Sequence, residues 1–306
     1  MSIPLLLDAS LLGLQYALLA VGVFLTFRIL NIPDLTVDGS FCLGMSVTAV
    51  LCVEGHPFLG LLAGALAGAA AGVVTGVLMT KAKINPLLAG IITMTGLYTV
   101  NITVLGGPNV SLLAADKGYT VIAQALGLST EAGEIVFTLG IVALAVVALA
   151  LFFRTELGLC IRATGDNESM VRASSINANA MKVGTLALSN TLVGLAGGIL
   201  AQCQGFADVS SGSGMIIIGL ASVIIGELFG GGRSVTLGLV GAVVGSVVYR
   251  IIVQVALSLD IMSANSLKLV SAVIVAAFLC VPAVRAWVVQ RRTRARARAR
   301  LGKGRE

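Results

Sequence analysis

The sequence predicts an all-α integral membrane protein with about nine transmembrane helices. Hydrophobic residues occupy 57% of the 306 positions and charged residues only 11%, and the mean hydropathy is +1.02. A soluble globular domain has about 25% charged residues. Several apolar runs also exceed the roughly 18 residues that a helix needs to cross a bilayer. These run lengths exclude a soluble protein with a large core.

The expected spans are separated by connections of very different lengths, and the second and seventh spans are short for a crossing. The nine ranges are 10–30, 37–53, 57–79, 86–105, 134–153, 183–204, 215–229, 235–257 and 267–284.

Basic residues favour one side of the membrane when alternate connections are compared. Cytoplasmic loops carry an excess of Lys and Arg, and these residues gather on one side: Arg28, Lys81, Lys83, Arg154, Arg162, Arg172, Lys182, Arg233 and the tail from Arg285. We therefore expect a multi-pass protein with its N-terminus outside and its C-terminus in the cytoplasm.

The net charge of +6 comes from the C-terminal tail. From Arg285 onward the chain holds nine basic residues and one acidic residue, whereas the rest holds eleven basic and thirteen acidic. We divide the chain into a transmembrane domain, 1–286, and a basic cytoplasmic tail, 287–306. The tail suits anionic lipid headgroups, and nothing in the distribution indicates a nucleic-acid partner.

The segment NIPDLTVDGS, 31–40, predicts a broken helix near the start of the chain. Pro33 removes a backbone donor and restricts the residue before it, and Asp34 or Thr36 can cap the helix that follows. Asp38 lies one turn beyond Asp34 on the same face. Two interpretations remain open, namely helix capping with a cytoplasmic-side ion pair, or a broken helix facing a solute route with Asp38 in an inner gate.

Other polar residues within the spans are candidates for a translocation pathway. Thr hydroxyls can also bond their own backbone carbonyls, and an arginine near a span end can reach the headgroups instead of a central cavity. The candidate pathway residues are Asp34, Thr36, Asp38, Asn85, Thr93, Thr95, Asn101 and Arg250.

The third expected span carries a glycine at every fourth position, which places all the glycines on one helix face. Small residues at this spacing allow another helix to approach closely. We expect this stripe, which is formed by Gly60, Gly64, Gly68, Gly72 and Gly76, to pack within the chain.

The longest expected cytoplasmic loop, 154–182, is polar and contains a short helix signal. Asp166 or Asn167 can cap a helix that follows, and Glu168 suits its positive N-terminal end. Such a helix could be a surface for a partner or an amphipathic stub on the headgroups.

The stretch FRTELGLCIRATGDNESMVRASSINANAMKVGTLALSNTLVGLAGGILA resembles the permeases of bacterial binding-protein-dependent ABC importers, in the branched-chain amino acid and ribose permease family. ASVIIGELFGGGRSVTLGLVGAVVGS and LNIPDLTVDGSFCLGMSV resemble further recurrent parts of that family. KINPLLAGIITMTGLY is closest to an uncharacterised or amino acid-carrying subgroup. An amino acid is therefore the first expectation for the solute, with a sugar or nucleoside left open.

The resemblance implies a dimeric permease of the inner membrane, driven by cytoplasmic ABC ATPase subunits and supplied by an extracytoplasmic binding protein. A homodimer is the first expectation, with a paralogous second permease left open. The resemblance also implies a coupling helix after a break at Gly165, formed by Asp166, Asn167, Glu168, Ser169, Met170, Val171, Arg172, Ala173, Ser174, Ser175 and Ile176. No GxxxxGK[ST] motif occurs in the sequence, so ATP and Mg are expected on the partner. We expect no catalysis, cofactor or metal site in this chain.

An alternative from a different class is an ion-coupled secondary transporter. Ionisable residues at membrane depth mark ion or substrate pathways, and Asp34 and Asp38 could form a proton relay.

Overall fold

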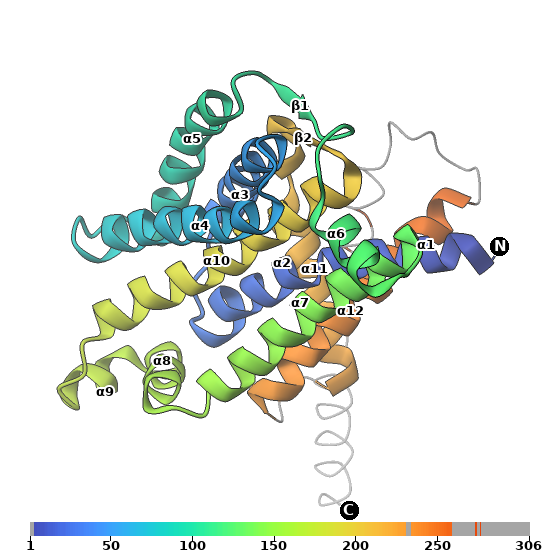
Figure 1. The fold of residues 1–306 in the computed structure, drawn as a ribbon. Helices are drawn as coiled ribbons and strands as arrows, with labels where there is room; N and C mark the ends of the chain where they lie inside the picture. The colour runs from blue at the N-terminus through green and yellow to red at the C-terminus, as the bar shows by residue number, and fades with distance from the viewer. Residues whose placement is uncertain (1–2, 231–233, 259–272, 274–275, 277–306) are drawn as a thin grey trace, which may run out of the picture.

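The computed structural model describes residues 3–230, 234–258, 273 and 276, which form a helical bundle with one small strand pair (Figure 1). The elements are α1 (Ile3–Gln15), α2 (Ala17–Phe24), the π-helical η1 (Leu25–Ile29), α3 (Thr36–Val53), α4 (Pro57–Thr80), α5 (Pro86–Leu105), β1 (Asn109–Ser111), α6 (Gly118–Leu126), α7 (Thr130–Phe152), α8 (Glu156–Asp166), α9 (Glu168–Ala173), α10 (Ala178–Gln204), β2 (Phe206–Asp208), the 3-10 helix η2 (Val209–Gly212), α11 (Met215–Gly230) and α12 (Val235–Ser258).

Seven of the described helical segments are long and apolar enough to cross a membrane alone, and α1 with α2–η1 forms an eighth span bent by 40° at Tyr16. The prediction of an all-α membrane protein is confirmed. The expected ninth span, 267–284, lies outside the described residues except for 273 and 276, and so does the tail, 287–306.

The predicted break near the start of the chain is present between η1 and α3. Residues 30–35 leave the helix, with Asn31 at a φ of 55° and Pro33 exposed. The additional bend at Tyr16 was not predicted, because no proline lies near it.

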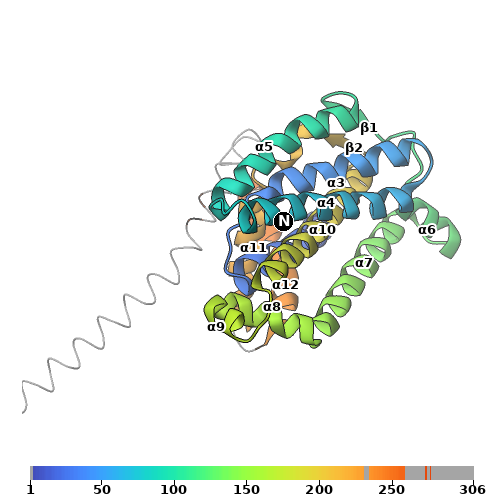
Figure 2. The ribbon, with the colours of Figure 1, turned by 90° about the vertical axis from the view of Figure 1, so that its left-hand side faces the viewer.

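The glycine stripe of α4 packs against α3 and α10, as Figure 2 shows for the side-by-side course of the three helices. A Cβ at Gly64 would lie 2.7 Å from the carbonyl oxygen of Gly44, and one at Gly76 would lie 2.9 Å from the Cα of Val183. At Gly68 a Cβ would overlap the carbonyl oxygen of Asn190. The prediction of close packing within the chain is therefore confirmed.

The two ends of the bundle carry different connections. At one end, which we call the ribbon end, β1 pairs antiparallel with β2, and Val110 lies opposite Ala207. At the other, the loop end, α8 and α9 connect α7 to α10 (Figure 1). Both α6 and α8 formed in segments that we expected to be loops.

We predict that Gly68→Val destabilises the protein. Overpacking at a tight contact costs about 1–3 kcal/mol, and the backbone of α10 has no flexible side-chain end that could move away from the new methyl groups. Thermal denaturation in detergent, followed by size-exclusion chromatography, measures the effect.

Gly140→Val on α7 is the matched control, because a Cβ there meets no other heavy atom within 4 Å. Equal midpoints for the two variants would contradict the close contact.

Candidate functional site

Asp34 is buried at the break before α3 and is held by hydrogen bonds alone. The Thr36 N–H donates to Asp34 Oδ1 at 2.9 Å, and Asn190 Nδ2 on α10 donates to Asp34 Oδ2 at 2.8 Å. Ser40 donates its hydroxyl to Asn190 Oδ1, and Asn190 Nδ2 also donates to the Leu186 carbonyl. This polar cluster fixes the start of α3 against the middle of α10.

A row of buried threonines extends the cluster across α3, α4 and α5. Thr36 Oγ1 lies 2.7 Å from Thr75 Oγ1, and Thr75 donates to Thr93 Oγ1 at 2.9 Å. Thr93 in turn donates to the Ala89 carbonyl. The row satisfies hydroxyls that would be costly to bury alone.

Asp38 caps a helix that lies 176 residues further along the chain. Its two carboxylate oxygens accept the Gly214 N–H at 2.9 Å and the Ile216 N–H at 2.8 Å, both at the start of α11. The first N–H groups of a helix lack intrahelical partners and carry partial positive charge. The half-buried Asp38 therefore joins α3 to the N-terminus of α11.

A pocket of about 430 Å³ opens between α3, α5 and the η2–α11 connection. Three candidate pathway residues line it, namely Asp38, Thr95 and Asn101. Asn101 also donates to the Gly39 carbonyl at 3.2 Å, which holds α5 against α3. The other lining residues are Gly39, Cys42, Met94, Tyr98, Val209, Ser210, Gly212 and Ser213.

The remaining candidates lie elsewhere. Asp34, Thr36 and Thr93 belong to the buried cluster, and Asn85 caps α5 by accepting the Leu87 N–H. Arg250 on α12 stacks over the Tyr16 ring at 3.9 Å from its centroid.

Asp34 and Asp38 bind different partners, and neither takes part in the ion pairs found between described residues. An ion pair at the loop end is formed instead by Arg28 and Glu227, at 2.6 Å.

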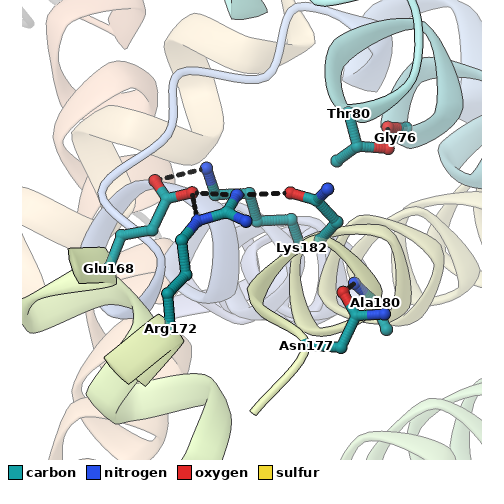
Figure 3. Close-up of polar contacts among 8 residues, drawn as sticks. Gly76, Thr80, Glu168, Arg172, Asn177, Ala180 and Lys182 are labelled. Atoms are coloured by element: carbon teal, nitrogen blue, oxygen red, sulfur yellow. Dashed lines mark hydrogen bonds and ion pairs between the residues drawn. The ribbon is translucent and has the colours of Figure 1, made fainter. Parts of the chain in front are cut away.

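The helix α9 at the loop end is capped by Asn167 and held by ion pairs, and Figure 3 shows the ion pairs. Asn167 accepts the Met170 N–H at 3.1 Å, as the sequence allowed. Glu168 binds Arg172 at 2.7 Å and Lys182 of α10 at 2.6 Å, and Arg172 also donates to Asn179. The side chain of Met170 on the same helix is 62% exposed.

Two details of the expected coupling segment were wrong. The helix covers Glu168–Ala173 rather than Asp166–Ile176, and Gly165 does not break the chain before it. Gly165 lies inside α8, where a Cβ would overlap the Ile29 carbonyl of η1. The glycine is needed for close packing, which sequence spacing alone did not reveal.

Sequence reasoning also missed Asn190 and Thr75. Both are polar residues within apolar spans, and that signal would have identified them as candidates. Their partners could not be deduced, because Asp34 and Asn190 are 156 positions apart.

A family model described as the permease component of branched-chain amino acid transport systems matches residues 5–282. The chain belongs to this permease family. The family resemblance expected from the sequence is thereby confirmed.

Several curated proteins are similar to the permease. A tyrosine transport system permease of Clostridioides difficile is 33% identical over 268 residues, which is 87% of this chain and 88% of that protein. The ribose import permease of Escherichia coli is 30% identical over 74% of this chain and 71% of its own length. A galactofuranose transporter permease of Escherichia coli is 28% identical over 74% of this chain and 66% of its own length. No solved structure matches the permease.

We predict that Asn190→Ala destabilises the permease by about 1–3 kcal/mol, because Asp34 and Ser40 lose a buried partner. The thermal midpoint in detergent measures this loss. Thr191→Ala is the matched control, since Thr191 bonds only the Ala187 carbonyl of its own helix among described residues. An Asn190→Ala midpoint equal to that of the control would refute the role of the cluster.

We also predict a pH dependence for the anchoring of α9. The hydrogen bonds and charges of Lys182 and Arg172 hold the pKa of Glu168 below its ordinary value of 4.5. The ion cluster therefore stabilises α9 fully above about pH 4.5 and is lost as the pH falls through the lower folded-state pKa.

Glu168→Gln should remove the ion pairs that anchor α9 at neutral pH, as acid does in the unmodified permease. Exposed ion pairs contribute little to stability, so we expect trypsin to cleave after Arg172 only about two to three times faster in this variant. Glu156→Gln, at the exposed start of α8, is the control. Identical cleavage rates in both variants would show that the cluster does not anchor α9.

Proposed function

We propose that the permease is the membrane-spanning subunit of an ABC importer and carries a small solute, an amino acid in the first instance, across a bacterial inner membrane. An extracytoplasmic binding protein would deliver the solute, and separate ABC ATPase subunits would supply the energy. Family membership over residues 5–282 carries the proposal. The sequence contains no P-loop, so ATP and Mg would be bound by the partner subunits.

The helix α9 is the proposed contact with the ATPases. It is short, braced to α10, and presents Ser169, Met170 and Ala173 to solvent. Basic residues at the same end favour a cytoplasmic location by the positive-inside rule. A cytoplasmic C-terminus, an external N-terminus and assembly as a homodimer belong to the same proposal.

The bundle offers a direct mechanical route from α9 to the pocket. Lys182 ties α9 to the first turns of α10, and Asn190 on the same helix holds Asp34 at the start of α3. One turn later on α3, Asp38 holds the N-terminus of α11. ATP-driven movement of α9 would therefore shift α10 and α3 together and bias the pocket between inward-open and outward-open states.

The pocket has a feature that suits the ammonium group of an amino acid. Asp38 provides a carboxylate, and none of the described lining residues is Lys, Arg or His. Met94 and Tyr98 form an apolar wall. An ammonium group beside Asp38 with an apolar side chain against that wall is complementary to this surface. The tyrosine transport permease among the similar proteins supports the same substrate class.

We predict ATP-dependent uptake by proteoliposomes that contain the permease, its ABC ATPase and its binding protein. Radiolabelled aromatic and branched-chain amino acids serve as substrates, and unlabelled ribose serves as competitor. Uptake should require ATP on the side of the membrane where the ATPase subunits lie. Excess ribose should not reduce the uptake of the amino acids.

Proteoliposomes containing the permease alone, under a proton or sodium gradient, are the control. Gradient-driven uptake without the ATPase would overturn the proposal in favour of an ion-coupled transporter. ATP-driven uptake of ribose instead of amino acids would retain the importer and overturn only the substrate class.

A further inference from the structure

A groove of about 410 Å³ lies at the loop end between the end of α7, α8 and the start of α12. Figure 1 shows these three segments at the same edge of the molecule. We propose that this groove, which we call the arginine groove, binds the headgroup of an anionic phospholipid. Its lining residues include Phe153, Arg154, Arg162, Ser234 and Leu237.

The charge of the arginine groove is not balanced by the part of the chain that the structure describes. Arg154 and Arg162 are exposed, whereas the ion pairs between described residues use Arg28, Arg172 and Lys182. No described lining residue is acidic. Guanidinium groups bind phosphate oxygens through paired, charge-assisted hydrogen bonds. Two arginines facing one groove therefore suit a phosphate group.

The start of α12 adds to this positive potential. Ser234 caps the helix by accepting the Leu237 N–H at 3.2 Å, and α12 continues for 24 residues. The N-terminal end of a helix of this length carries a partial positive charge. The headgroup would thus meet two arginines and a helix terminus within one groove.

The position of the groove selects a lipid rather than a soluble phosphate. Arg154 follows directly on the apolar span α7, and Ser234 directly precedes the span α12. Exposed apolar residues extend from the groove along α7 and along α12. On each helix they are three or four positions apart, so they lie on one face of that helix. They are Leu144, Val147 and Leu151 on α7, and Leu237, Val240 and Val244 on α12. A diacyl lipid would cover these two stripes, while a free phosphate would leave them unused.

A neighbouring pocket at the same end does not offer the same site. It is lined by Arg28, Arg162, Asp166 and Glu227, and Arg28 is already paired with Glu227. The two carboxylates there would repel a phosphate. We therefore place the anionic lipid in the arginine groove, between Arg162 and the start of α12, and not in this neighbouring pocket.

Native mass spectrometry of the full-length permease in detergent tests the proposal. Phosphatidylglycerol and phosphatidylcholine with identical acyl chains are titrated separately. We expect phosphatidylglycerol to bind more tightly and to raise the thermal midpoint. The double variant Arg154→Gln/Arg162→Gln should lower its affinity about tenfold or more, because each basic residue contributes to anionic-lipid binding.

Lys81→Gln/Lys83→Gln is the matched control, since both lysines are exposed at the loop end and do not line the groove. Its affinity for phosphatidylglycerol should equal that of the unmodified permease. Equal binding of the two lipids, or equal losses in the two double variants, would overturn the proposal. Inorganic phosphate that displaces the lipid at millimolar concentration would identify a soluble anion as the ligand and also overturn it.

Discussion

The need to satisfy two carboxylates inside a helical bundle organises this fold. A carboxylate removed from water requires several hydrogen bonds or a cation, and Asp34 and Asp38 obtain theirs from uncharged groups. Asp34 uses a backbone N–H and the amide of Asn190, and Asp38 uses two N–H groups of α11. Because the partners lie on α10 and α11, satisfying these carboxylates also fixes α3 between the two later helices.

The glycine contacts make these hydrogen bonds geometrically accessible. In lipid, helix association relies on close packing and interhelical hydrogen bonds instead of a hydrophobic drive. Gly68 of α4 lies against the carbonyl of Asn190, and Gly44 of α3 lies against Gly194. The backbones are thus close enough for the short side chains of Ser40, Thr36 and Thr75 to span the gap. The stability of the core and the position of the pocket beside Asp38 depend on the same contacts.

Local features of the sequence predicted much of this arrangement. The glycine at every fourth position, the break at Pro33 and the cap at Asn167 each depend on only a few neighbouring residues, so the sequence alone was enough to predict them. Three other features could not be predicted because they arise from distant segments: Asn190 beneath Asp34, Arg250 over Tyr16, and Gly165 against η1. Asp38, Thr95 and Asn101 line the same pocket, whereas Arg250 is not among its lining residues. No pattern within a single helix could have predicted which candidates would lie together.

Hydrogen–deuterium exchange of the full-length permease in nanodiscs most directly tests the claim that Asp38 holds the N-terminus of α11 in place. The account predicts that Asp38→Ala speeds exchange at the amides of 214–218 by about tenfold, through loss of two cap hydrogen bonds, and leaves the middle of α10 unchanged. Thr95→Ala, which alters the same pocket without touching α11's N–H groups, should leave 214–218 protected. Unchanged exchange at 214–218 in Asp38→Ala would contradict the account.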